Sequence, residues 1–179
     1  MPDELPSVEE ELLVTERFRV VRRREAGPGG VVLDRTTIQH PGAVVILPLV
    51  DRDTVCLIRN YRSAVRRSLI ELPAGTLELG EEPRDTARRE LAEETGYRAG
   101  RIEPLGEWLM SPGILNERMA AFLATELTPG PVDLQPGESI ELLPTPWSEA
   151  IEMVRYGAIQ DAKTVAALLL YDRFGRTES

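Results

Sequence analysis

The sequence predicts a single domain of the mixed class, an α/β or α+β sandwich, because segments typical of strands are interspersed with a few segments typical of helices. Residues 43–50 form a continuous apolar run, which is typical of a strand buried on both faces. Residues 83–95 begin at Pro83 and stop before Gly96, which is typical of the two ends of a helix. A length of 179 residues allows one domain, or one domain with a small extension, around a sizeable core.

The N-terminal half is expected to consist of strands. Residues 1–11 are polar and are expected to lie outside the regular elements, whereas residues 12–39 predict an antiparallel hairpin around the Gly- and Pro-rich turn at 27–30. After the buried strand, a turn at 51–53 leads to a returning strand at 54–58. A short strand at 69–72 ends at Pro73.

The C-terminal half is expected to alternate strands with two closing helices. Strands are expected near 101–110, 119–127 and 139–143, with a Pro- and Gly-rich loop at 129–137. Ser148 is expected to cap a helix that runs to about Tyr156, and Asp161 to cap a second that runs through Tyr171 with an apolar face.

Composition excludes several classes of protein. The net charge of −9 argues against a nucleic-acid partner, and no run approaches the roughly 20 apolar residues that a membrane span needs. Cys56 is the one cysteine, so no disulfide can form within the chain and a cytoplasmic location is expected. It lies in an apolar run and is interpreted as a core residue, not a nucleophile. An anionic substrate would need divalent cations to offset the acidic charge.

Three glutamates of the predicted helix form the most informative feature. Glu90 and Glu94 are four residues apart, so they share one helix face, with Glu93 beside them. Like charges at this spacing, close to the helix C-terminus, destabilise a helix. A solvated surface face is the ordinary interpretation of such a cluster. The alternative is a site for a hard cation such as Mg²⁺, which binds oxygen ligands and substrate phosphates.

The spacing of these residues resembles the signature of the Nudix hydrolases. That signature is Gly, five residues, Glu, seven residues, then Arg-Glu-apolar-x-Glu-Glu-x-Gly-apolar, and every fixed position is filled across the 23 residues 75–97. The matching residues are Gly75, Glu81, Arg89, Glu90, Leu91, Glu93, Glu94, Gly96 and Tyr97.

The resemblance implies an α/β/α sandwich with a mixed sheet. It implies an N-terminal antiparallel strand extension at 1–41 and a Nudix domain at 42–179. It also implies a site for Mg²⁺, with Mn²⁺ as a possible substitute. Glu90 and Glu94 would be the main ligands, with contributions from Glu93, Glu81 and the carbonyl of Ala74. Arg89 would orient a glutamate through a charge-assisted hydrogen bond.

Residues outside the signature resemble the ADP-ribose pyrophosphatase branch, and the resemblance covers roughly residues 15–171. Pro112 stands sixteen residues after Gly96, and Gly113 follows it. Arg62 and Glu71 occur in segments similar to that branch, although Asn60 stands where its members often have Gln. In that branch Arg62 would face the substrate phosphates, with Glu71 beside the site. The ordinary interpretations are a plain turn for Pro112 and a surface salt bridge for Arg62.

The branch also places a general base on a loop after the signature, in the pattern Glu-x-apolar-Glu. Glu138 and Glu141 fit this pattern, with Glu138 the first choice. The ordinary interpretation is that both are exposed glutamates at the end of a loop. His40, the one histidine, is interpreted as structural, because no nucleophile signature accompanies it.

The function expected from the resemblance is Mg²⁺-dependent hydrolysis of ADP-ribose to AMP and ribose 5-phosphate. Hydrolysis of GDP-mannose or another nucleoside-diphosphate sugar is the alternative within the same chemistry. An alternative of another class is a non-catalytic sensor that binds ADP-ribose. The extension at 1–41 is expected to support a homodimer and to complete the substrate site.

Overall fold

The computed structural model describes residues 9–134 and 139–176, and within these residues seven strands form a mixed central sheet. Five of them follow the order β10-β5-β4-β9-β8, with β6 paired to β5 and β7 to β4. Strands β4 and β9 are parallel, and the other described pairs of this sheet are antiparallel. The strands are β4 (Ala43–Asp51), β5 (Thr54–Arg62), β6 (Arg67–Glu71), β7 (Ala74–Thr76), β8 (Tyr97–Leu109), β9 (Arg118–Pro129) and β10 (Ile140–Pro146).

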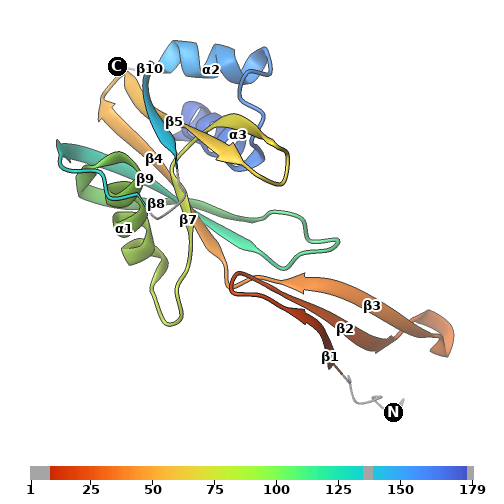
Figure 1. The fold of residues 1–179 in the computed structure, drawn as a ribbon. Coiled ribbons are helices and arrows are strands. Elements are labelled where there is room, and N and C mark those ends of the chain that lie inside the picture. The colour runs from red at the N-terminus through yellow and green to blue at the C-terminus, as the bar shows by residue number, and fades with distance from the viewer. Residues whose placement is uncertain (1–8, 135–138, 177–179) are drawn as a thin grey trace.

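Helices cover both faces of this sheet, so the predicted α/β/α sandwich is confirmed (Figure 1). Helix α1 (Pro83–Thr95) lies on one side, and α2 (Trp147–Arg155) and α3 (Ala162–Leu170) lie on the other. A π-helical turn, Tyr171–Gly175, follows α3. None of the described helices is long and apolar enough to cross a membrane.

Strand β4 supplies the core on both faces, because its side chains alternate between them. Val45 and Leu47 pack with buried residues of the α2 and α3 side, such as Leu168. Val44 and Ile46 pack with the α1 side, where Ala87 and Leu91 are fully buried. The continuous apolar run of the sequence is therefore a strand buried on both faces, as predicted.

The N-terminal segment forms a separate three-stranded antiparallel sheet that stands out from the body of the molecule (Figure 1). Its strands are β1 (Glu9–Val14), β2 (Arg19–Ala26) and β3 (Val32–Gln39), with a 3₁₀ turn at Pro28–Gly30. The predicted hairpin is thus β2 and β3, and β1 adds a third strand. The expectation that residues 1–11 lie outside regular elements is wrong for residues 9–11.

Ion pairs explain why this acidic segment becomes a strand. Glu10 pairs with Arg22 at 3.3 Å and Glu11 with Arg19 at 2.7 Å, both across the β1–β2 ladder. Glu9 likewise contacts Arg23, whose guanidinium holds the pKa of that carboxyl below its ordinary value. Opposite charges on neighbouring strands favour pairing of those strands. A search for alternating apolar residues does not detect this signal.

Two of the predicted helix caps have different outcomes. Asp161 caps α3 as predicted, because its side chain accepts a hydrogen bond from the Thr164 backbone N–H. The Ser148 cap is wrong, because α2 begins at Trp147 and its N-cap residue is Pro146, without a side-chain cap bond. The Trp147 N–H instead donates to the Asp53 carbonyl at 2.7 Å. The turn between β4 and β5 therefore satisfies the first N–H group of α2.

Candidate active site

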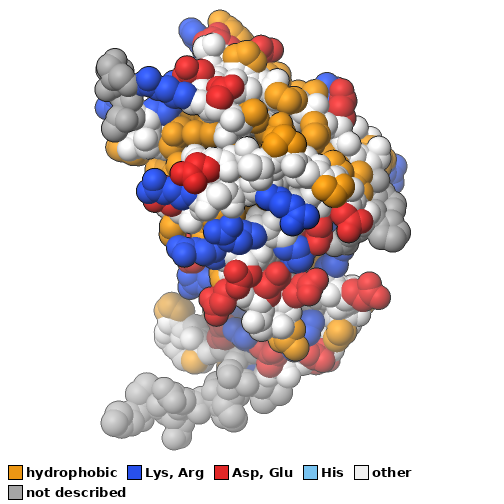
Figure 2. Space-filling model, turned by 90° about the vertical axis from the view of Figure 1, so that its left-hand side faces the viewer, with side chains coloured by type: hydrophobic (Ala, Val, Ile, Leu, Met, Phe, Trp, Pro, Cys, Tyr) orange, Lys and Arg blue, Asp and Glu red, His pale blue; other side chains and the backbone are white. Residues whose placement is uncertain are grey.

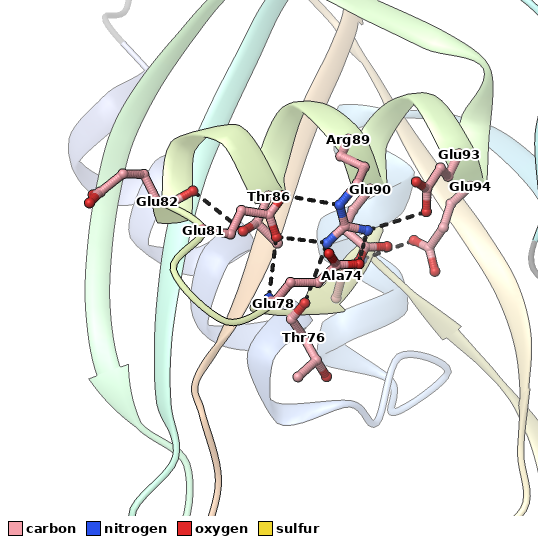
Figure 3. Close-up of polar contacts among 10 residues, drawn as sticks. All are labelled: Ala74, Thr76, Glu78, Glu81, Glu82, Thr86, Arg89, Glu90, Glu93 and Glu94. Atoms are coloured by element: carbon pink, nitrogen blue, oxygen red, sulfur yellow. Dashed lines mark hydrogen bonds and ion pairs between the residues drawn. The ribbon is translucent and has the colours of Figure 1, made fainter. Parts of the chain in front are cut away.

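Helix α1 presents its glutamates toward β7 and the loop that follows it (Figure 3). Glu90 and Glu94 are buried, with 8% and 4% of their surface exposed. The backbone N–H of Ala74, at the start of β7, donates to Glu94 Oε2 at 2.9 Å. Two largely buried carboxylates need hydrogen-bonding partners. The backbone of β7 supplies one such partner, to Glu94.

Gly75 explains how closely β7 approaches this helix. A Cβ added at Gly75 would lie 1.9 Å from the carboxylate carbon of Glu90. No other residue type fits beside Glu90 without displacing it, because this contact is far inside van der Waals distance. The first glycine of the signature therefore leaves room for the Glu90 carboxylate in its present position against β7.

Arg89 is hydrogen-bonded to three carboxylates of the signature (Figure 3). Its Nε donates to Glu81 Oε1 and its Nη2 to Glu81 Oε2, each at 3.0 Å, so the pair is bidentate. Its Nη1 donates to Glu90 Oε1 at 2.8 Å and to Glu93 Oε2 at 3.3 Å. Arg89 therefore offsets the like-charge repulsion that the sequence predicts for this helix face.

These contacts shift the pKa values of the groups involved. The hydrogen bonds from Arg89 lower the pKa of Glu81 to about 2. The hydrogen bond to Glu81 in turn raises the pKa of Arg89 above its ordinary value. Both groups therefore remain charged at neutral pH.

Figure 2, which views the side on which α1 lies in Figure 1, shows acidic and basic side chains mixed over this face.

The carboxylate oxygens of this cluster are suitable ligands for a divalent cation. Their side chains do not converge on a common position in this structure. Among residues 9–134 and 139–176, no group of three or more His, Cys, Asp or Glu side chains is arranged to hold a metal ion. Arg89 stands between Glu81, Glu90 and Glu93 in this arrangement. The oxygen ligands themselves are those that hard cations bind.

A cavity of about 250 Å³ lies beside β7. Ala74 and Gly75 line one part of it, and Arg62, Asp161 and Lys163 line another. The cavity therefore joins the Nudix signature to cationic side chains from β5 and α3.

The cations that line this cavity belong to a network of four charged side chains, two cations and two carboxylates. Arg62 donates to both oxygens of Glu71, from Nε at 2.9 Å and from Nη2 at 2.6 Å. Lys163 Nζ lies 2.6 Å from Glu71 Oε2 and 2.8 Å from Asp161 Oδ1. Burial raises the pKa of Glu71, but the bonds from both cations outweigh it and hold that pKa below its ordinary value. Arg62 thus makes a bidentate pair with a buried carboxylate, although its own side chain remains 38% exposed.

Lys163 and Asp161 were not among the site residues predicted from the sequence. The sequence feature that could have indicated them is the position of Lys163, in the first turn of a helix that is otherwise largely apolar. A cation is unfavourable at that end of the helix dipole, so its presence there indicates a nearby carboxylate.

The predicted loop residues Pro112 and Gly113 are exposed and follow Met110, which lines the cavity. Their loop docks on the end of β3, because the Ile38 N–H donates to the Ile114 carbonyl at 2.8 Å and the Asn116 N–H donates to the Ile38 carbonyl at 3.2 Å. This loop, which joins β8 to β9, therefore connects the N-terminal sheet to the central sheet.

Of the two candidates for the general base, Glu141 lies in the part of the chain that the structure describes. Glu138 lies outside the described residues. Glu141 lies on β10, where its carboxylate is 2.9 Å from Arg59 Nε and both side chains are largely exposed. His40 Nδ1 accepts a hydrogen bond from the Gly42 N–H at 3.2 Å, which fits the structural role expected for it.

Comparison with known proteins agrees with this arrangement. A sequence model of the NUDIX domain matches residues 38–168, which include the whole signature and all seven described strands of the central sheet. The chain belongs to the Nudix family. The prediction of a Nudix hydrolase is therefore confirmed, and members of this family generally need divalent metal ions.

Two curated relatives are more than a third identical to this Nudix chain over the aligned residues. An ADP-ribose pyrophosphatase of Bacillus subtilis is 36% identical over 143 residues, which cover 79% of this chain and 77% of the relative. A GDP-mannose pyrophosphatase of Escherichia coli is 38% identical over 136 residues, which cover 71% of each chain. The fold is also similar to a crystal structure described as an ADP compounds hydrolase, with a TM-score of 0.82, 24% identity, and coverage of 93% of this chain and 91% of the other.

Proposed function

We propose that this Nudix hydrolase cuts the diphosphate linkage of ADP-ribose with water, giving AMP and ribose 5-phosphate. The main supporting observation is that one cavity is lined by both the β7 end of the signature and the Arg62 side chain. A diphosphate needs cationic partners, and Arg62 presents a rigid fork of donors suited to phosphate oxygens. The Bacillus subtilis relative supports ADP-ribose as the substrate.

We propose Mg²⁺ as the cofactor, with Mn²⁺ as a substitute. Glu90 and Glu94 would hold it, with Glu93, Glu81 and the Ala74 carbonyl as further ligands. Such an ion would lower the pKa of bound water and neutralise phosphate oxygens. Its charge would also offset the net charge of −9 that opposes an anionic substrate.

The chain's own residues would bind and orient the substrate. Arg62 would contact the diphosphate while Glu71 fixes the direction of its guanidinium. Arg89 would hold Glu81, Glu90 and Glu93 in place. The Ser111–Asn116 loop, which includes Pro112 and Gly113, would border the sugar or nucleoside end of the substrate. Glu138 would take the proton of the attacking water, with Glu141 as the second choice.

A substrate panel tests the proposed activity. The purified chain is incubated with ADP-ribose, GDP-mannose, ADP-glucose or NADH in Mg²⁺, and products are separated by ion-exchange chromatography. We expect AMP and ribose 5-phosphate from ADP-ribose, and no products after EDTA treatment. Binding of ADP-ribose without turnover in Mg²⁺ or Mn²⁺ would instead identify a non-catalytic sensor.

Hydrolysis of GDP-mannose is the second candidate function, and the Escherichia coli relative favours it. The diphosphate is common to both substrates, so the signature and Arg62 serve either. The two candidates are separated by kcat/KM for each substrate. A higher value for GDP-mannose would replace ADP-ribose in our proposal.

We also propose that residues 1–41 form an extension that supports a homodimer and contributes to the substrate site. Leu13, Val14 and Val32 of this sheet are about half exposed. A small sheet needs a covered apolar face for stability. A cavity of about 440 Å³, lined by residues that include Arg17, Gln39 and Leu79, lies where the extension meets the Nudix domain.

We propose a cytoplasmic location. The supporting observation is that Cys56 is free and fully buried, and burial raises the pKa of its thiol to about 11. A chain without disulfides can fold in a reducing compartment.

A further inference from the structure

The side chain of Glu71 lies between two cations from distant parts of the chain. It is fully buried, and it accepts two hydrogen bonds from Arg62 and one from Lys163. A buried carboxylate with a single partner would be poorly compensated, whereas three charge-assisted bonds fix its position. The direction of the Arg62 guanidinium is therefore set by a carboxylate that Lys163 also holds.

Lys163 is itself held by the start of helix α3. Asp161 caps this helix, accepting hydrogen bonds from the Thr164 N–H at 3.0 Å and from Thr164 Oγ1 at 2.6 Å. Thr164 Oγ1 in turn accepts a hydrogen bond from the Leu72 N–H at 2.8 Å. Leu72 follows Glu71 directly and leads to Ala74, so the first turn of α3 is bonded to the segment that carries both Glu71 and β7.

The four charged side chains balance one another, since Arg62 and Lys163 offset Glu71 and Asp161. Two of the five N–H groups of the Arg62 guanidinium are used by Glu71, which leaves three for a ligand in the cavity. Loss of the Lys163 charge would leave this wall of the cavity with a net negative charge and would free one side of Glu71. Both effects disfavour an anion beside Arg62.

We infer that Lys163 is a positioning residue for the diphosphate of the substrate, acting through Glu71 on the guanidinium of Arg62. This inference rests on the proposed function, because it assumes that a diphosphate lies in the cavity beside β7. It assigns α3, which the sequence marks only as an apolar helix, a part in substrate binding.

The test compares Lys163→Met with Lys163→Arg, which keeps the charge, and with Arg67→Met as the matched control. Arg67 is an exposed cation that contacts Gln160 at 2.6 Å, close to the start of α3 but outside the buried network. Kinetics with ADP-ribose and Mg²⁺ give kcat and KM, and the melting temperature is measured for each variant. We expect Lys163→Met to raise KM about tenfold or more with a smaller change in kcat, because binding common to ground and transition states is lost. Lys163→Arg should recover most of that loss, and Arg67→Met should match the wild type.

A merely structural role predicts a lower melting temperature with unchanged KM for the folded variant, and that result would overturn the inference. If Lys163→Met does not fold, Lys163→Gln removes the charge but keeps a donor to Glu71, and an unchanged KM in this variant would overturn the inference. If the wild type hydrolyses no nucleotide sugar, the proposed function fails. Calorimetric titration with ADP-ribose, which needs no turnover, then still tests Lys163: equal affinity for wild type and Lys163→Met would reject it.

Discussion

At the scale of single residues, the carboxylates of α1 differ in what they contact, although the sequence shows them as one cluster. Glu94 accepts the Ala74 N–H, whereas Glu90 and Glu93 are bonded to Arg89. Glu93 has the most exposed side chain of the three, at 26%. These differences predict that each glutamate has its own effect when it is neutralised.

Glu94→Gln should separate the metal role of this residue from its structural role. The glutamine Oε1 can still accept the Ala74 N–H, so the melting temperature should hold or rise as like-charge repulsion is relieved. Turnover should fall at least ~10²-fold, because a metal ligand is lost. Glu103→Gln, on the exposed side of β8, is the control for an exposed glutamate. A lower melting temperature together with full activity would contradict the assignment.

Glu138→Gln and Glu141→Gln should distinguish the two base candidates. Loss of a general base slows the chemical step by about 10²–10⁴-fold without removing metal ligands. We expect that loss for Glu138→Gln, with unchanged Mn²⁺ affinity by calorimetry. Glu141 pairs with the exposed Arg59, so Glu141→Gln should cost little. The reverse order of effects would transfer the role to Glu141.

At the scale of elements, the loop between β7 and α1 is bound to the helix through Glu81 and Arg89. The pKa of Glu81 falls from 4.5 to about 2 on folding, so the unfolded chain takes up a proton there before the folded chain does. The stabilisation is therefore complete above the unfolded value, near pH 4.5, and is lost as the pH falls toward 2.

Urea unfolding across this acid range measures that contribution. The free energy of unfolding should fall more steeply for the wild type than for Glu81→Gln between pH 4.5 and 2. Glu71 adds to the slope in both proteins, because its pKa is also lowered by its cationic partners. Equal slopes for the two proteins would show that the Glu81–Arg89 pair does not stabilise the fold.

The elements that the sequence predicted are those with a strong local signal. The apolar run of β4 and the Pro83 and Gly96 boundaries of α1 were sufficient to find both elements, and the left-handed Gly96 ends the helix with its N–H bonded to Ala92. Strand β1 was missed because its pairing rests on Glu–Arg contacts, and β7 because it has only three residues. The glutamates were found through fixed spacing within one segment. The Lys163–Glu71 pair joins residues 92 positions apart, which no local pattern reveals.

At the scale of the whole molecule, the N-terminal sheet stands apart from the central sheet and leaves several apolar side chains exposed. Leu13, Val20 and Ile38 are cross-strand neighbours on one face, and Val32 lies on the same face of β3. Leu13 and Val32 are 51% and 48% exposed. In the homodimer that we propose, a second copy of the chain would cover this face, and the Ile38 contact with the Ser111–Asn116 loop would connect it to the site.

Substitution of Leu13→Asp together with Val32→Asp should convert a dimer to a monomer, as measured by size-exclusion chromatography with light scattering. A buried charge on each strand opposes association, because its desolvation is uncompensated. Arg35→Gln, on the opposite face of β3, should remain a dimer. A monomeric wild type, or a dimeric double variant, would remove the proposed role of this face.

The central claim is that the α1 carboxylates hold divalent ions against a diphosphate, and anomalous diffraction tests it most directly. Crystals are grown with Mn²⁺ and a non-hydrolysable ADP-ribose analogue, and data are collected at the manganese edge. We predict anomalous peaks within coordination distance of Glu90 and Glu94, with the diphosphate beside Arg62. A bound analogue without manganese at these glutamates would contradict the account.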